Sequence, residues 1–213
     1  EDNAFYYLRH SMIVQNGASG NVLGYNHSYR AFAAEGVNTD YLLSDMEFHG
    51  GHPNMNLFEG NNGMKLAADN YWGSSRNNTF FRNYASIQSE GEARTIIYAL
   101  WPVEVDTQNM NYNFVGNVLG TSIYTPIVNS APLVWLLGLN NANGTTSTAY
   151  PENAANATMV DASVLNSMIR HGNVEQATGA IQWASSNHTL RSTYYLQTRP
   201  DFTNKPKFFG SMT

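Results

Sequence analysis

"NLFEGN", residues 56–61, is one of four six-residue units that align in this chain without a gap. The other three are "NVLGYN" (21–26), "NTFFRN" (78–83) and "YNFVGN" (112–117). Every unit ends in asparagine, and three of them also begin with it. A large apolar residue stands three positions before the final asparagine. This apolar column consists of Leu23, Phe58, Phe80 and Phe114, and the final column of Asn26, Asn61, Asn83 and Asn117.

Recurrence of a unit along a chain is typical of a solenoid, in which each repeat packs on its neighbours. The final asparagines are 35, 22 and 34 residues apart. A spacing of 22 suits one compact coil, and the longer spacings suit coils with an inserted loop. We therefore predict one apolar side chain pointing inward per coil and a corner asparagine that bonds to the next coil. "RHGN" (170–173) offers a further corner at Asn173.

The composition favours a turn-rich β protein. Asparagine occurs 27 times, alongside 17 glycines, and it favours turns over helices. Hydrophobic residues make up 42% of the chain, which is enough for a core, whereas charged residues make up only 13%. Coincidence in an asparagine-rich chain is the alternative explanation of the repeat. A β-sandwich would also need short strands, but it would not predict the recurring unit.

Four stretches carry a resemblance to a known class of proteins. They are "NVLGYNHSY", "FHGGHPNMNLFEGN", "DNYWGSSRNNTFFRN" and the C-terminal "STYYLQTRPDF…KPKFFGSM". From about residue 20 onward the chain resembles the C-terminal portion of bacterial secreted right-handed parallel β-helix repeat proteins, which have a pectate-lyase-like solenoid. The resemblance implies an all-β, right-handed parallel β-helix and a secreted, extracellular or cell-surface location. It transfers no catalytic residue, because the Asp, Lys and Arg pattern of classical pectate lyases is not recognisable here.

We expect one β-helix domain over residues 1–213, with inserted loops. Residues 139–158 are small and polar, which predicts a surface loop, and residues 194–213 predict an extended C-terminal cover. Residues 161–173 open with either a short helix or a strand. "NAFYYLRHSMIVQNG" already has strand character, so we expect the chain to start inside the solenoid, with its open coil end covered by another copy or by a segment outside this sequence.

The candidates for catalysis are acidic residues and a histidine near the second unit. "DMEFH" (45–49) alternates, so Asp45, Glu47 and His49 share an outward face where they could perform acid–base chemistry or form an ordinary solvated surface. Glu59 should point outward from its unit because Phe58 points inward. His49 and His52 are weak candidates for a metal site, since the Gly-Gly between them favours a structural turn.

A second cluster has the composition of a sugar-binding groove. "DNYWGSSRNNTFFRN" (69–83) combines aromatic rings, which stack on sugar rings, with polar groups that bond to hydroxyls. The alternative is a loop packed on the solenoid wall. The ligand-binding candidates are Asp69, Tyr71, Trp72, Arg76 and Arg82.

Several function classes are disfavoured. The net charge of −5 with only 11 Lys and Arg argues against nucleic acid, no apolar run is long enough to cross a membrane, and no nucleotide-binding or serine-hydrolase motif occurs. No cofactor is expected. The first hypothesis is a structural or surface solenoid whose coil ends join other copies, giving filaments. The alternative is a carbohydrate-active enzyme, either a polysaccharide lyase or a glycoside hydrolase, or a non-catalytic glycan-binding protein.

Overall fold

The computed structural model describes residues 1–31, 42–88, 99–121, 134–140 and 161–198. Within these ranges the protein is all-β except for one short helix, α1 (Ala162–Ser167), whose first turn is capped by the Asp161 side chain accepting from the Ser163 N–H. The helix opens the segment for which the sequence left helix and strand open. No helix in the described part of the chain is long and apolar enough to span a membrane.

The strands form three sheets, in which every pairing but one is parallel, so the prediction of an all-β fold with stacked parallel strands is confirmed. Sheet A contains, in spatial order, β1 (Ala4–Tyr6), β4 (His27–Tyr29), β7 (Asn62–Gly63), β10 (Tyr84–Ala85), β13 (Val118–Leu119), β16 (Asn173–Glu175) and the antiparallel β17 (Ala180–Gln182). Sheet B contains β2 (Met12–Gln15), β5 (Met46–His49), β8 (Leu66–Ala68), β11 (Val103–Val105) and β14 (Trp135–Leu137). Sheet C contains β3 (Val22–Gly24), β6 (Leu57–Glu59), β9 (Thr79–Phe81), β12 (Asn113–Val115) and β15 (Ile169–His171).

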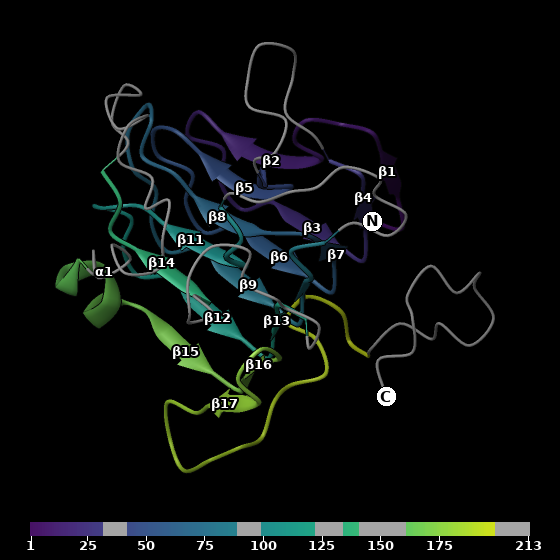
Figure 1. Cartoon of the computed structure of the whole chain (residues 1–213), viewed down its shortest axis with the longest axis vertical. Coiled ribbons are helices and arrows are strands. Elements are labelled where there is room, and N and C mark those ends of the chain that lie inside the picture. The colour runs from purple at the N-terminus through teal and green to yellow at the C-terminus, as the bar shows by residue number, and fades with distance from the viewer. Residues whose placement is uncertain (32–41, 89–98, 122–133, 141–160, 199–213) are drawn as a thin grey trace.

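The chain visits the sheets in a fixed cycle, passing from B to C to A and back to B. Each cycle adds one strand to each sheet, and the strands stack along the long axis of the molecule (Figure 1). This topology is compatible with a parallel β-helix. The unequal spacing of the repeat follows from it, because the residues added in the 35- and 34-residue intervals fall in the connections from sheet A to sheet B.

The apolar column fills the interior. Phe58, Phe80 and Phe114 are fully buried, and their ring centroids lie 5.3 Å and 5.0 Å apart in a continuous stack. Leu23 occupies the matching position on β3 and is partly buried. From sheet B, Phe48 meets the edges of Phe58 and Phe80 at 5.0 Å and 5.1 Å. Parallel register therefore stacks identical side chains because each coil repeats the preceding one.

Two columns of asparagines border sheet C. In the first, the asparagine ladder, each Oδ1 accepts both the backbone N–H and the Nδ2 of the asparagine one coil earlier, at 2.9–3.2 Å. Its members are Asn3, Asn26, Asn61, Asn83, Asn117 and Asn173. A second ladder joins Asn21, Asn56 and Asn78, and it ends where Asn78 Nδ2 donates to the hydroxyl of Tyr112. Tyr112 thus replaces the first asparagine of the fourth unit in function as well as in position.

Candidate functional site

A cluster of ionisable side chains lies on the outer face of sheet B. Met46 and Phe48 of β5 point into the core, so Glu47 and His49 project outward. Asp69 directly follows β8, and its N–H donates to the carbonyl of Phe48 at 3.2 Å, which places it beside His49 on the neighbouring coil. The parallel register thereby brings together two residues that are 20 positions apart in the sequence.

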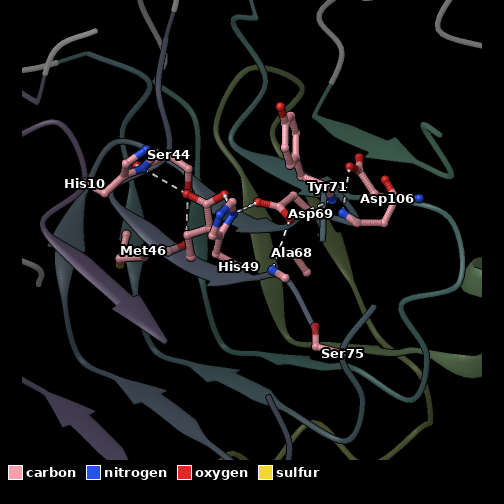
Figure 2. Close-up of polar contacts among 12 residues, drawn as sticks. His10, Ser44, Met46, His49, Ala68, Asp69, Tyr71, Ser75 and Asp106 are labelled. Atoms are coloured by element: carbon pink, nitrogen blue, oxygen red, sulfur yellow. Dashed lines mark hydrogen bonds and ion pairs between the residues drawn. The ribbon is translucent and has the colours of Figure 1, made fainter. Parts of the chain in front are cut away.

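Asp69 and His49 form a directly bonded pair. Figure 2 shows the His49 Nδ1 facing a carboxylate oxygen of Asp69. The other Asp69 oxygen accepts the N–H groups of Gly50 at 3.3 Å and Tyr71 at 3.0 Å, so the carboxylate is held in one orientation. The Nε2 of His49 makes no hydrogen bond within the described residues, and the side chain is 26% exposed. This nitrogen is the group of the cluster that is best placed to meet a substrate.

Glu47 is the third member of this cluster. Its Oε1 lies 3.8 Å from His49 Nδ1, and one ligand-type atom from each of Glu47, His49 and Asp69 falls within 4.8 Å of the others. His10 Nδ1 approaches Glu47 Oε2 to 2.9 Å, but its hydrogen bond goes to the Ser44 carbonyl at 2.8 Å. Glu47 Oε2 is therefore buried without a well-directed hydrogen bond among the described residues.

The surroundings separate the pKa values of the two carboxyls. Burial, together with the neighbouring Asp69, raises the pKa of Glu47 well above its usual value. Burial would also raise the pKa of Asp69, but hydrogen bonds from His49 and Glu47 lower it overall. The bond to Asp69 raises the pKa of His49. These shifts favour the acid form of Glu47, the anion of Asp69 and the cation of His49, so the cluster has the groups that proton transfer requires.

The next coils continue the ionisable surface. Glu104 of β11 lies two coils from Glu47 in the same outward position, and its carboxylate receives Lys65 Nζ at 2.5 Å and the Trp101 indole N–H at 2.9 Å. Asp106 follows β11 as Asp69 follows β8, and Asp69 lies between His49 and Asp106 in Figure 2. Burial, with Glu104 nearby, raises the pKa of Asp106.

Aromatic side chains lie at the edge of the cluster. The Tyr71 ring centroid is 6.4 Å from that of His49, and Trp72 packs edge-on against Tyr71 at 4.6 Å while remaining 64% exposed. Gly50 makes this approach possible, since its φ is +70° and a Cβ there would lie 3.0 Å from the Trp72 Cβ. Gly50 and Gly51 of the "HGGHP" segment therefore pack closely against Trp72, whose side chain stays largely exposed.

Asp45 departs from the expected row of outward, solvent-facing groups. Its side chain is fully buried, and its oxygens accept the N–H groups of Met64 at 2.9 Å and Lys65 at 3.1 Å. Burial raises the pKa of Asp45 to about 6. This residue fastens the connection into β8 and is not part of the exposed cluster. Glu47 is also buried, so only His49 of the trio reaches solvent.

Glu59 projects outward from sheet C as expected, but it is fully buried beneath the C-terminal segment. Its carboxylate accepts the hydroxyls of Tyr25, at 2.6 Å, and Thr193, and the N–H of Tyr194 at 2.8 Å. Gly60 lets the Tyr25 ring lie across this corner, because a Cβ there would come within 2.4 Å of it. Glu59 therefore anchors residues 193–194 on sheet C and is not part of the Glu47–His49–Asp69 cluster. Residues 199–213 of the predicted cover and 141–158 of the predicted loop lie outside the described residues.

The remaining candidates separate in space. His52 is exposed, has φ +71° and lies outside the Glu47–His49–Asp69 cluster. Arg76 is exposed in a corner loop, and Arg82 donates to the backbone carbonyl of Arg191 at 2.9 Å. Of the predicted sugar-binding set, only Asp69, Tyr71 and Trp72 gather beside His49. His10, Lys65, Glu104 and Asp106 were not predicted. "VEVD" (103–106) repeats the alternation of "MEFH", and this pattern would have identified Glu104 and Asp106 as candidates.

Glu47, His49 and Asp69 have the atoms to hold a divalent cation. However, the Nδ1 of His49 and an Asp69 oxygen bond to each other, so an ion bound between these two atoms would have to replace that hydrogen bond. The histidine pair considered from the sequence, His49 and His52, does not converge. The geometry therefore fits proton transfer better than metal binding.

No protein-family model matches the chain, and comparisons with curated proteins and with solved structures found no match either.

Proposed function

We propose that the protein is a carbohydrate-active enzyme whose fold is a right-handed parallel β-helix of the pectate-lyase-like type. The B–C–A cycle of parallel strands and the ladders at the corners support the fold. The observation that carries the function is the Asp69–His49 pair on the outer face of sheet B, with the buried acid Glu47 beneath it and exposed Trp72 beside it.

The proposed chemistry is cleavage of a polysaccharide by proton transfer. His49, as an imidazolium, donates its Nε2 proton to the leaving glycosidic oxygen while the C–O bond breaks. Water then adds to the sugar carbon, and the proton that it releases returns to His49. Asp69 orients the ring and stabilises its cationic form, as the buried carboxylate does in histidine-dependent hydrolases.

The charges at the site favour a neutral sugar and hydrolysis over elimination from a uronate. Asp69 is paired with His49, and Lys65 with Glu104. The cationic groups of the site are therefore already bonded to carboxylates, and a uronate carboxylate would have to compete with Asp69 and Glu104 for them. Trp72 and Tyr71 supply the ring faces on which sugar CH groups stack.

The test is a screen of neutral and acidic polysaccharides for chain cleavage. We expect new reducing ends without the ultraviolet absorbance of an unsaturated product, and activity that falls as the pH rises through the raised pKa of His49. His49→Gln and Asp69→Asn should each reduce cleavage by about 10²-fold or more. His52→Gln is the matched control, because this exposed histidine lies only three residues further along the chain and outside the cluster.

Three results would count against the proposal. If the protein cleaves none of the polysaccharides, the proposed activity is refuted. If His49→Gln is as active as the wild type, His49 takes no part in the chemistry. Loss of activity in a chelator, restored by a divalent ion, would favour the metal site.

Self-assembly is the second candidate function. Within the described ranges, β1, β2 and β3 each pair on one side only, and all three belong to the N-terminal coils. Unpaired strand edges at one end can receive another copy, and head-to-tail contacts of this kind give open filaments. Electron microscopy of native material would show fibres; monodisperse monomers at all concentrations would refute this candidate. Secretion remains part of both proposals and is tested by assaying the culture medium.

A further inference from the structure

The outer face of sheet C carries a groove that the proton-transfer site does not use. Its floor is a column of outward residues from four successive strands, namely Leu57, Thr79, Asn113 and Ile169, which face one another in exact register. At a strand spacing of about 4.8 Å, this column extends about 14 Å along the stacking axis. The groove therefore runs across the strands and has the length of a short oligomer.

The groove is walled on both sides. Met55 and Asn77, in the corner loops between sheets B and C, line one wall. Tyr194 forms the other, with its ring 4.1 Å from that of Phe81 and its backbone N–H bonded to Glu59. The groove is open to solvent, and its volume of about 540 Å³ is within the usual range of small-molecule sites, roughly 300–1,000 Å³.

Exposed apolar side chains gather on this face. Nine large hydrophobic side chains are exposed in the described part of the chain, and four of them lie on the outer face of sheet C or at its border: Val22, Met55, Ile169 and Tyr194. Met55 is 70% exposed and Ile169 49%. Concentration of such side chains in one place marks an interaction surface, since single exposed hydrophobics are ordinarily scattered.

Hydrogen-bonding groups lie between the apolar ends of the column. Asn113 lines the groove and its Nδ2 donates to Thr79 Oγ1 at 3.1 Å, while its Oδ1 has no hydrogen-bond partner among the described residues. The hydroxyl of Tyr194 and the Nε2 of His171 are likewise without a hydrogen bond there. Within the described residues, no Lys, Arg, Asp or Glu lines the groove.

We propose that this groove binds one neutral polysaccharide chain lying along the stacking axis. A glycan presents both apolar CH faces and hydroxyls, and the column offers Leu57 and Ile169 at its two ends for the former and Thr79 and Asn113 between them for the latter. The uncharged lining offers nothing to a polyanion, which the net charge of −5 also repels. Binding here needs no chemistry at His49, so the inference goes beyond the proposed enzyme activity.

The experiment is affinity electrophoresis in native gels that contain laminarin, xylan or glucomannan, with polygalacturonate as the acidic probe. We expect at least one neutral polysaccharide to retard the protein. Ile169→Asp should weaken this binding by at least about tenfold, because it places a charge against an apolar sugar face. Tyr194→Phe, which removes a single hydroxyl, should weaken it by about fivefold.

Ile181→Asp on β17 is the matched control, because the same substitution is made at a residue of similar exposure, 52%, outside the groove lining. It should bind as the wild type does. Three results would overturn the inference. The protein is retarded by polygalacturonate alone, it is retarded by none of the glycans, or the retardation is the same in Ile169→Asp as in the wild type. Binding without cleavage would support the groove and refute the proposed enzyme activity. Cleavage without groove-dependent binding would support the enzyme activity and refute the groove.

Discussion

Replacing Asn83 with alanine should lower the free energy of unfolding by about 3–6 kcal/mol. Asn83 lies in the middle of the asparagine ladder and is 1% exposed. Its Oδ1 accepts the backbone N–H and the Nδ2 of Asn61 at 3.0 Å and 2.9 Å, and its Nδ2 donates to the carbonyl of Phe58 at 3.0 Å and to Asn117 Oδ1 at 3.2 Å.

The magnitude follows from what the truncation leaves behind. Alanine removes four hydrogen bonds at once, and the polar groups of Asn61 and Phe58 stay buried without those partners. Each orphaned buried group costs about 1–3 kcal/mol, and partial relaxation keeps the total below the simple sum. Since domains of this kind have about 5–15 kcal/mol of stability, the variant should be close to unfolding.

Urea denaturation followed by tryptophan fluorescence measures the change, with far-ultraviolet circular dichroism as a second probe. Asn3→Ala is the internal control, because Asn3 is the exposed end member of the same ladder and its loss should cost less than about 1 kcal/mol. Asn83→Asp keeps an acceptor but loses the donor, so it should also be strongly destabilised. Equal effects of Asn83→Ala and Asn3→Ala would refute the claim that buried ladder bonds hold the coils together.

Three further predictions concern buried charges. Glu59→Ala should release the C-terminal segment, costing about 2–4 kcal/mol and exposing residues near Thr193 to limited proteolysis; an unchanged digestion pattern would contradict this. Acidification from pH 7 to pH 5 should stabilise the protein, because a carboxyl whose folded pKa is raised loses stability as the pH rises from its unfolded value towards it. For Asp45, with a folded pKa of about 6, the gain between pH 7 and pH 5 is about 1.3 kcal/mol in thermal or urea unfolding, and Asp45→Asn should flatten the profile. Lys65→Met should lower the free energy of unfolding by about 3–5 kcal/mol, because Glu104 stays buried without its partner. In urea unfolding, the double variant with Glu104→Leu should recover most of that loss, and additive effects of the two substitutions would refute the pairing.

The pH prediction has contributions of both signs. The raised pKa values of Glu47, Asp106 and His49 act in the same direction as that of Asp45, because each of these groups binds protons more tightly in the folded state. Burial lowers the pKa of His10, so its contribution opposes them. The lowered pKa of Asp69 matters only in acid, where its stabilisation is lost as the pH falls below about 4.

The candidate site was only partly predictable from the sequence. The alternation of "DMEFH" correctly separated Met46 and Phe48 from Glu47 and His49, because a strand fixes the direction of neighbouring side chains. It could not say what covers an outward residue. Glu59 faces outward by the same rule, yet a segment more than 130 positions later buries it. Asp69 became the partner of His49 only through the pairing of β5 with β8.

The sequence by itself determined the repeating elements, since an inward aromatic and a corner asparagine recur with every coil. A local period needs no knowledge of the rest of the chain, because each coil packs chiefly on its two neighbours. The tertiary structure decided which ionisable groups meet. Parallel stacking places residues about one coil apart within hydrogen-bonding distance, and loops of unequal length make that separation 20 residues for His49 and Asp69 but 56 for the last ladder pair, Asn117 and Asn173. Proximity across coils, and with it the Glu47–His49–Asp69 cluster, therefore depends on register, which only the folded chain sets.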